Sequence, residues 1–207
     1  MLLKMVCSMA FTILAAYPLS KKDLPGRSGF MLVITITMYF SAGMIPAYLL
    51  NKQLHLLNTV SVLVLPGLVS AFNLIILRSF FMSINDSLYE AAYMDGCSEW
   101  RALAQIALPL SKAAILTLSL FYAVDRWNGV SDIILYIQNP GFYTLQYKLK
   151  LMLDTINIPY EEGIEQTVVP ENFKSACIVF TMIPMLVMYP FVQKYFREGV
   201  MIGGVKE

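Results

Sequence analysis

Charge is scarce in this chain of 207 residues. Lys and Arg together number 15 and Asp and Glu 14, so charged residues make up 14% of the sequence and the net charge is +1. A soluble domain of ordinary composition carries about 25% charged residues. The shortage argues against a soluble globular fold, and the lack of a basic excess leaves no case for a nucleic-acid partner.

Histidine and cysteine are scarce as well. The single histidine is His55, and the three cysteines are Cys7, Cys97 and Cys177. The cysteines have no metal-ligand spacing and form no obvious disulfide framework, and we interpret His55 as a solvated loop residue. We therefore expect no metal site.

Two further absences concern enzymatic function. The sequence has no glycine-rich loop ending in Gly-Lys-Ser or Gly-Lys-Thr, so we expect this chain to bind no cofactor, ATP included. An intramembrane enzyme would need a Ser–His or paired-aspartate arrangement on facing helices, and Asp125 alone lies clearly inside an apolar run. We therefore expect a protein without catalytic residues.

Long apolar runs fill most of the sequence, and 57% of the residues are hydrophobic. A helix that crosses the hydrocarbon core needs roughly 20 mostly apolar residues. Five stretches qualify or nearly qualify: 1–19, 29–50, 58–82, 113–135 and 175–196. The sequence predicts an all-α polytopic membrane protein with about five transmembrane helices, in one transmembrane domain over 1–207. Four prolines are expected to mark kinks or span ends: Pro46, Pro66, Pro184 and Pro190.

Lysine and arginine in the links predict the orientation, because cytoplasmic loops carry the basic excess. That excess falls on the link after the first run, on 83–112 and on the C-terminal tail. We therefore expect 83–112 to face the cytoplasm, and the acidic segment 136–173 to be an extracellular loop. The first run also half fits a cleaved signal peptide, since Lys4 precedes an apolar core with small residues near Ala15, but a true span is the better interpretation.

The stretch SINDSLYEAAYMDG, from Ser83 to Gly96, has the chemistry of a short helix. Asn85 or Asp86 can cap its first turn, Ser87 and Glu90 have capping-box spacing, and Gly96 allows a left-handed end. A second helix, CSEWRALAQIAL, follows with an apolar face at helical spacing: Trp100, Leu103, Ala104, Ile106 and Ala107. By periodicity alone, an ordinary amphipathic linker at the membrane surface explains the stretch equally well.

The spacing of this stretch resembles the EAA signature of importer-type ABC transporter permeases. Glu-Ala-Ala at 90–92 is followed by Gly96 and then by Ile-x-Leu-Pro at 106–109. The segments LPGRSG, LPGLVSAFNLIILRSFFMSI, DRWNGVSD and YFREGVMIGGVKE extend the resemblance over nearly the whole chain. They are similar to carbohydrate-uptake permeases of the type of the maltose permease's second subunit, in the subgroup for polysaccharides and oligosaccharides. That family usually has six spans, so we expect this chain to lack the first.

The resemblance implies that 83–112 is a cytoplasmic coupling loop that docks on an ATPase. Glu90 would pair with a basic group on the ATPase or brace the loop, and Gly96 would form the turn. The residues implied in ATPase coupling are Glu90, Ala91, Ala92, Asp95, Gly96, Ile106, Leu108 and Pro109.

The resemblance also implies the function and the partners. The chain would be a permease subunit of an ATP-driven, binding-protein-dependent importer of sugars, expected to be oligosaccharides, in the bacterial inner (plasma) membrane. It would pair with a second permease subunit, a cytoplasmic dimer of ATP-binding subunits and an extracellular solute-binding lipoprotein, with ATP bound by the ATPase. The alternatives are an ABC permease for a non-sugar solute and a truncated fragment that does not assemble.

Four residues near the end of the fourth run are possible pathway or substrate residues: Asp125, Arg126, Trp127 and Asn128. Ionisable groups inside a membrane are costly and usually face a cavity or a partner. Trp127 would stack on a sugar ring and Asn128 would bond a hydroxyl; alternatively, Trp127 is an interfacial anchor. Arg126, Lys148 and Lys150 would favour an anionic sugar, whereas the acidic residues of the predicted outer loop argue against one, so the charge of the substrate stays open.

Overall fold

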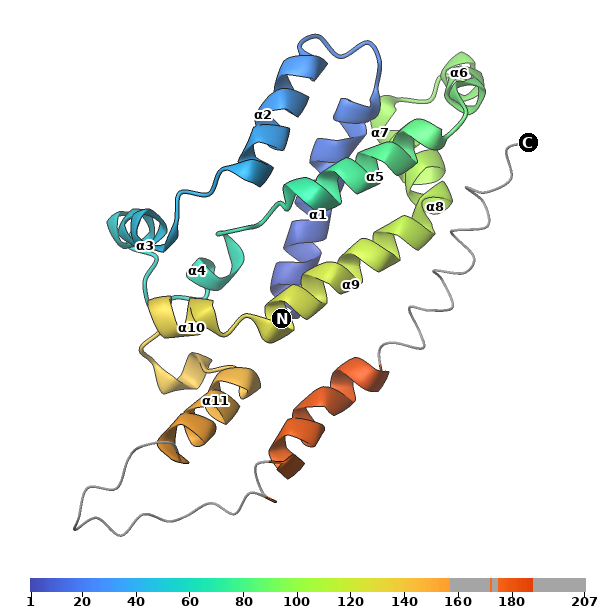
Figure 1. The fold of residues 1–207 in the computed structure, drawn as a ribbon. Helices are drawn as coiled ribbons and strands as arrows, with labels where there is room; N and C mark the ends of the chain where they lie inside the picture. Colours follow the sequence, from blue (N-terminus) through green and yellow to red (C-terminus); the bar gives the residue numbers. More distant parts are fainter. Residues whose placement is uncertain (157–171, 173–174, 188–207) are drawn as a thin grey trace, which may run out of the picture.

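The computed structural model describes residues 1–156, 172 and 175–187, and helices form the secondary structure of that part (Figure 1). No β-strand occurs among the residues described, and the predicted all-α fold is confirmed. The elements are α1 (Leu2–Ser20), α2 (Arg27–Tyr39), α3 (Met44–Gln53), α4 (Ser61–Val64), α5 (Ala71–Ser83), α6 (Asp86–Met94), α7 (Glu99–Ala102), the π-helix η1 (Leu103–Ala107), α8 (Leu108–Leu110), α9 (Lys112–Asn128), α10 (Ser131–Tyr136), the 3-10 helix η2 (Pro140–Phe142) and α11 (Leu145–Ile156). A further helix covers Ser175–Val187.

Helix α1 lies at the centre of the packing, against both α5 and α9, and α2 packs on α5 (Figure 1). Ala16 of α1 and Ala123 of α9 are fully buried, and small residues let helix backbones approach closely. Leu77, Phe81 and Leu118 fill the rest of this core. Because α1 touches both partners, a displacement of α1 would be felt by the whole helical core.

A buried polar chain also joins these helices. The Tyr122 hydroxyl of α9 lies 2.7 Å from Thr12 Oγ1 of α1, and it accepts a hydrogen bond from the backbone N–H of Ser70 at 3.0 Å. Thr12 donates in turn to the carbonyl oxygen of Ser8 at 2.7 Å. Polar side chains that bond between helices stabilise helix association inside a membrane, where water cannot satisfy them. The start of α5 is thereby tied to α1 and α9.

The second predicted span, 29–50, is not one straight helix. It consists of α2 and α3, which meet at an angle of 115°. The chain leaves the helix at Phe40, and Gly43 has φ of +85°, which a helix does not permit. Pro46 lies inside the first turn of α3, where proline is tolerated. The break itself is at Gly43, and Pro46 marks the beginning of the helix after it, one of the two roles predicted for this proline.

The predicted boundaries of the later spans also change. The third, 58–82, contains the short α4 and the longer α5, separated by a non-helical segment around Pro66 and Gly67. The fourth, 113–135, ends as α9 at Asn128 and resumes as α10. Of the fifth, 175–196, only the helix Ser175–Val187 lies within the described residues, and Pro190 lies outside them.

The predicted number of five spans is not confirmed. Within the described residues, only α1 is by itself long and apolar enough to cross a membrane, and the number rises to 3 if each of two bent pairs counts as one span. The second pair joins Glu99–Leu110 to α9 at 82°. The helices Ala71–Ser83 and Ser175–Val187 are apolar but shorter. The predicted extracellular loop 136–173 contains α11, and 157–171 lies outside the described residues.

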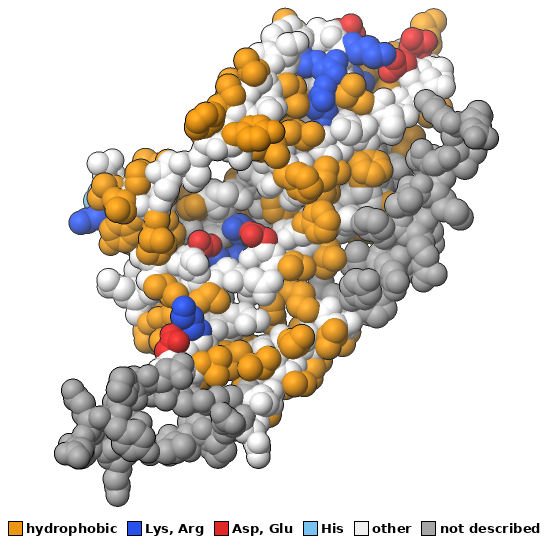
Figure 2. Space-filling model, in the orientation of Figure 1, with side chains coloured by type: hydrophobic (Ala, Val, Ile, Leu, Met, Phe, Trp, Pro, Cys, Tyr) orange, Lys and Arg blue, Asp and Glu red, His pale blue; other side chains and the backbone are white. Residues whose placement is uncertain are grey.

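Apolar side chains cover much of the outside. Helix α2 has no buried residue, and its exposed side chains include Phe30, Leu32 and Val33. Figure 2 shows hydrophobic side chains over α2 and along the neighbouring helices, with one group of Lys, Arg, Asp and Glu at the end that carries α6 and smaller groups elsewhere on this face. Such a surface needs contact with lipid or with another protein.

Candidate functional site

The segment between α5 and α9 lies at the end of the helices away from the N-terminus (Figure 1). Its first helix, α6, begins at Asn85, whose side-chain oxygen accepts a hydrogen bond from the backbone N–H of Ser87 at 3.1 Å. Asn85 is therefore the N-cap, which was one of the two residues predicted for that position. The predicted capping box between Ser87 and Glu90 was wrong, because Ser87 lies inside the helix and is not its N-cap. Asp86 stands in the first turn, where a negative charge suits the helix dipole.

Helix α6 ends in a defined turn at Gly96, as predicted. The N–H of Gly96 donates to the carbonyl oxygen of Tyr93 at 3.0 Å, and the N–H of Cys97 donates to that of Ala92 at 2.9 Å. These two bonds form a Schellman motif, which requires a left-handed residue. Gly96 supplies it with φ of +74°. A Cβ on Gly96 would meet no atom within 4 Å, so the backbone angle alone restricts this position.

The predicted second helix also forms, as α7, η1 and α8 in succession. Leu103 and Ala107 are buried, and Ile106 and Leu108 pack against the same hydrophobic core. Pro109 is exposed in the last turn before the bend at Ser111. The second half of the EAA-like pattern therefore packs mainly on this chain's own helices.

The first half of the pattern behaves differently, since Glu90, Ala91, Asp95 and Gly96 are exposed and Ala92 is half-buried. The side chain of Glu90 makes no hydrogen bond or ion pair with any residue that the structure describes. Met94, one turn later on the same face, is 89% exposed. This face of α6, with an unpaired carboxylate beside an exposed apolar side chain, has the composition of a docking surface.

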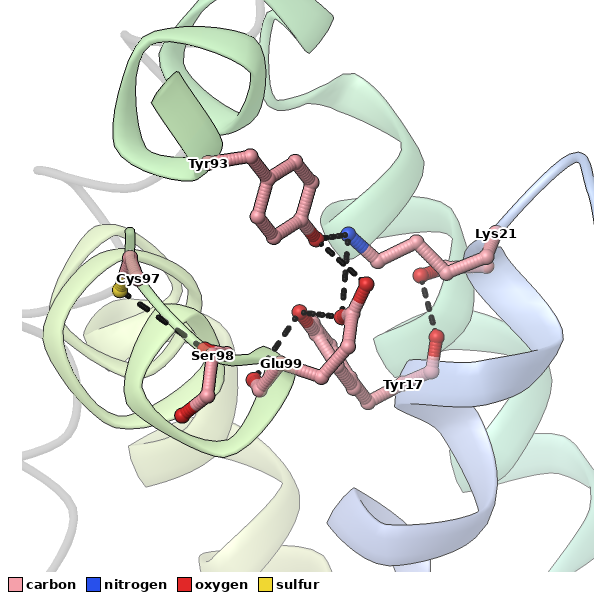
Figure 3. A network of polar contacts seen from close by, with 7 residues as sticks. Tyr17, Lys21, Tyr93, Cys97, Ser98 and Glu99 are labelled. Carbon is pink, nitrogen blue, oxygen red and sulfur yellow. Dashed lines mark hydrogen bonds and ion pairs between the residues drawn. The ribbon is translucent and has the colours of Figure 1, made fainter. Parts of the chain in front are cut away.

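A polar cluster, which we call the clasp, holds α6 and α7 to the end of α1. It consists of Tyr17, Lys21, Tyr89, Tyr93 and Glu99 (Figure 3 shows four of them by label). Tyr17 donates to Glu99 Oε2 at 2.9 Å, and Tyr93 donates to Glu99 Oε1 at 2.7 Å. Lys21 Nζ donates to the Tyr93 hydroxyl at 2.9 Å and lies 3.7 Å from Glu99 Oε2. One carboxylate thus joins three elements of the chain.

Three aromatic rings surround the ammonium group at the centre of the clasp. Lys21 Nζ lies 3.7 Å from the ring centroid of Tyr89, 4.9 Å from that of Tyr17 and 5.4 Å from that of Tyr93. A cation over an aromatic face contributes about 0.5–2 kcal/mol, with the larger values at desolvated sites. Tyr89 is itself buried in the core, so the clasp rests on a fixed base.

The clasp also controls the protonation of its members. Burial and the hydrogen bond to Glu99 raise the pKa of Tyr93 to about 12. Burial opposes ionisation of Glu99, but hydrogen bonds from Tyr93 and Tyr17 and the charge of Lys21 outweigh it and hold the pKa of that carboxyl below its ordinary value. At neutral pH, Tyr93 is therefore a hydroxyl donor and Glu99 a carboxylate.

A second bridge joins the same two parts of the chain at the surface. Lys22 Nζ lies 2.7 Å from Asp86 Oδ2, with side-chain exposures of 72% and 65%. The hydrogen bond from Lys22 lowers the pKa of Asp86. Exposed ion pairs contribute little stability. We therefore expect the loss of this bridge to have a smaller effect than the loss of a bond in the clasp.

The four predicted pathway residues lie at the opposite end of α9. Asp125 lies 3.7 Å from Lys4 Nζ of α1, and Arg126 Nη1 lies 3.0 Å from Asp132 Oδ2 of α10. The two neighbours thus point to different sides, as expected. Trp127 is half-buried and Asn128 is exposed.

Two buried side-chain donors at this end of α9 have no partner among the described residues. They are Arg126 Nη2 and Trp127 Nε1. Both side chains line a cavity of about 170 Å³ together with Thr144 and Gln146. An unsatisfied buried donor costs about 1–3 kcal/mol, so two of them at one cavity suit a ligand rich in acceptors.

The sequence patterns did not predict the clasp. Lys21 and Glu99 appear in the sequence only as charges of two separate segments predicted to be cytoplasmic, and no spacing relates them. Trp100, predicted on the apolar face, is 70% exposed and lines a cavity of about 420 Å³ beside Tyr17, whereas Leu103 is buried. The available signal was the tyrosine pair at i and i+4 in α6, Tyr89 and Tyr93, which places two rings on one face.

Comparison with known proteins accounts for this architecture. The family described as "Binding-protein-dependent transport system inner membrane component" matches residues 6–202. Protein LplC of Bacillus subtilis (strain 168) is 42% identical over 199 residues, which are 95% of this chain and 68% of that protein. The polygalacturonan/rhamnogalacturonan transport system permease protein YtcP of the same organism is 42% identical over 203 residues, 96% of this chain and 71% of that protein.

A solved structure is similar as well. It is the crystal structure of a bacterial ABC transporter involved in the import of the acidic polysaccharide alginate, with a TM-score of 0.78 and 35% identity. The match covers 92% of this chain and 69% of that chain. Membership of this family implies a partner ATPase, a second permease and a solute-binding protein. The chain therefore belongs to the inner membrane components of binding-protein-dependent transport systems, as a permease subunit and not as an enzyme.

Proposed function

We propose that this chain is a permease subunit of a carbohydrate importer and that its α6 face receives a cytoplasmic ATPase. The observation that carries the coupling role is the exposed face around Glu90, which an ordered Schellman turn holds in place. A dimer of ATP-binding subunits would dock there, and its closure on ATP would move α6. A second permease would enclose the pathway with this chain, and an extracellular solute-binding lipoprotein would deliver the solute.

Two observations support a saccharide as the solute. Relatives at 42% and 27% identity are named for polygalacturonan/rhamnogalacturonan and for arabinooligosaccharides. The outer end of α9 also offers the spare donors of Arg126 and Trp127 at one cavity. Hydroxyl and carboxylate oxygens of a sugar are acceptors that such donors bind, and the indole ring offers an apolar face for a sugar ring. We place Asp125 and Asn128 at the rim of this proposed contact.

The test is uptake by proteoliposomes that contain the complete transporter with its solute-binding protein. We expect uptake of labelled oligosaccharides that depends on ATP and on the solute-binding protein. Amino acids and short peptides serve as the comparison, because the EAA pattern is shared by permeases for other solutes. Uptake of those solutes without uptake of any oligosaccharide would contradict the saccharide assignment.

Arg126 is tested in the same vesicles with an acidic and a neutral oligosaccharide of equal length. We expect Arg126→Gln to lower uptake of the acidic one about tenfold relative to the neutral one, since a charge-assisted bond contributes about 1.5–3 kcal/mol. Asp132→Asn is the matched control, because it breaks the same ion pair but keeps the guanidinium. An equal loss for both sugars would show that Arg126 does not contact a substrate carboxylate.

A further inference from the structure

The side-chain contacts between α6 and the rest of the chain determine which helices a movement of α6 can displace. Tyr89 anchors α6 in the hydrophobic core, and Lys22 bridges it at the surface. Among the residues that the structure describes, its other polar ties to α1 run through Lys21 and Glu99 of the clasp (Figure 3). Helix α1 packs directly on α5 and α9, so a force applied to α1 reaches the helices of the core.

We propose that the clasp is the link through which a movement of α6 reaches α1, and that Glu99 is the positioning residue at its centre. The inference rests on the coupling role proposed above for α6 and adds a path beyond it. Movement of α6 would pull Tyr93, Tyr93 would pull Glu99 and Lys21, and Lys21 stands at the end of α1. Glu90 of the docking face lines the same hollow as Lys21, Tyr93 and Glu99, so the docking face adjoins this link.

The geometry favours a link that transmits force in both directions. Glu99 accepts hydrogen bonds from Tyr17 and Tyr93 on its two separate oxygens, so both oxygens are fixed. Hydrogen bonds fix both the distance and the direction between their two groups, whereas apolar contacts are non-directional. Tyr17 also packs edge-on against Phe81 of α5, with ring centroids 5.9 Å apart, which extends the path to α5.

The competing explanation is a clasp that only stabilises the loop. The two differ in what is lost when one bond is removed. A purely stabilising cluster would weaken assembly with the ATPase, and transport would fall in proportion. Breaking a link would leave assembly and basal ATP hydrolysis intact. The rate of hydrolysis would then no longer depend on the conformation of the transmembrane helices. Bonds that act in series would also give non-additive losses in a double variant.

The experiment uses the complete transporter in proteoliposomes and measures how strongly its solute-binding protein stimulates ATP hydrolysis. The variants are Glu99→Gln, which keeps the shape but removes the charge, and Tyr93→Phe, which removes one hydroxyl; the double variant is the third. Asp86→Asn is the matched control, since it breaks the exposed bridge between the same two parts of the chain. The amount of ATPase that co-purifies is measured for each.

We expect each single clasp variant to reduce the stimulation of ATP hydrolysis about tenfold. We expect the double variant to reduce it no further than the more strongly affected of the two single variants does. We expect Asp86→Asn to stay within about twofold of wild type, as exposed pairs do. Stimulation within about twofold of wild type in both clasp variants would overturn the link, and so would a loss of co-purifying ATPase that matches the lost stimulation. The readout needs no identified solute, so a wild-type complex that takes up no oligosaccharide would contradict the proposed substrate and not the clasp.

Discussion

Replacing Gly96 by valine is expected to abolish uptake while the subunit stays in the membrane. The φ of +74° at this position is one that a β-branched residue adopts only at a cost of at least about 1–3 kcal/mol. Valine would therefore leave the left-handed region and break the bonds from Gly96 to Tyr93 and from Cys97 to Ala92. Helix α6 would lose its fixed angle to α7, and the ATPase would meet a displaced surface. Uptake and membrane content of the subunit are the two measurements.

Gly96→Asn is the matched control. Asparagine is the residue that best tolerates the left-handed region after glycine. Because a Cβ at this position meets no atom within 4 Å, the Cβ of either variant is accommodated, and the two variants differ in backbone preference. We expect the asparagine variant to keep most of the uptake. A valine variant that transports at the wild-type rate would show that the turn at Gly96 has no part in coupling.

Reversing the charge of Glu90 is expected to have an effect of similar size. Glu90 is exposed and has no side-chain partner among the described residues, so Glu90→Lys breaks no hydrogen bond or ion pair within this part of the chain. On a docking surface, a like charge opposite a basic residue costs several kcal/mol. We expect uptake and the amount of co-purifying ATPase both to fall more than about 100-fold, with Glu90→Gln showing a smaller loss.

Asp154→Lys serves as the control for charge itself. Asp154 is also exposed, in α11, within the segment expected to be extracellular. The Asp154→Lys substitution changes the net charge by the same amount as Glu90→Lys but leaves α6 unchanged. Equal losses of ATPase from both variants, or none from either, would remove Glu90 from the docking surface.

The sequence was most informative where a single local rule decides the structure. The Gly96 turn follows from glycine's access to positive φ, and the start of α6 at Asn85 follows from capping. The 20-residue EAA pattern then fixed the family, because its spacing constrains two helices and the turn between them. Spacing alone does not show which part of the pattern faces a partner and which part packs on this chain. Burial in the structure does: Glu90 in the first part is exposed, whereas Leu108 in the second part packs against the hydrophobic core.

Other features could not be predicted because they depend on contacts between distant segments. An apolar run predicts a span by composition, but a run such as 29–50 says nothing of a break at Gly43, since glycine is tolerated in membrane helices. The clasp required Lys21 and Glu99 to meet through the packing of α1 on α5 and α9. The structure was needed to show that Asp132 pairs with Nη1 of Arg126, whereas Nη2 is buried without a partner among the described residues.

The most direct test of the central claim is the composition of the complex that co-purifies with the tagged 207-residue chain in mild detergent, determined by mass spectrometry. We predict a second EAA-bearing permease and two copies of a P-loop ATPase, with the ATPase lost selectively from the Glu90→Lys variant. A chain that is stable in the membrane and recovered without either partner would contradict its assignment as a working permease subunit. Recovery of the ATPase in equal amounts with Glu90→Lys would contradict the α6 face as its docking site.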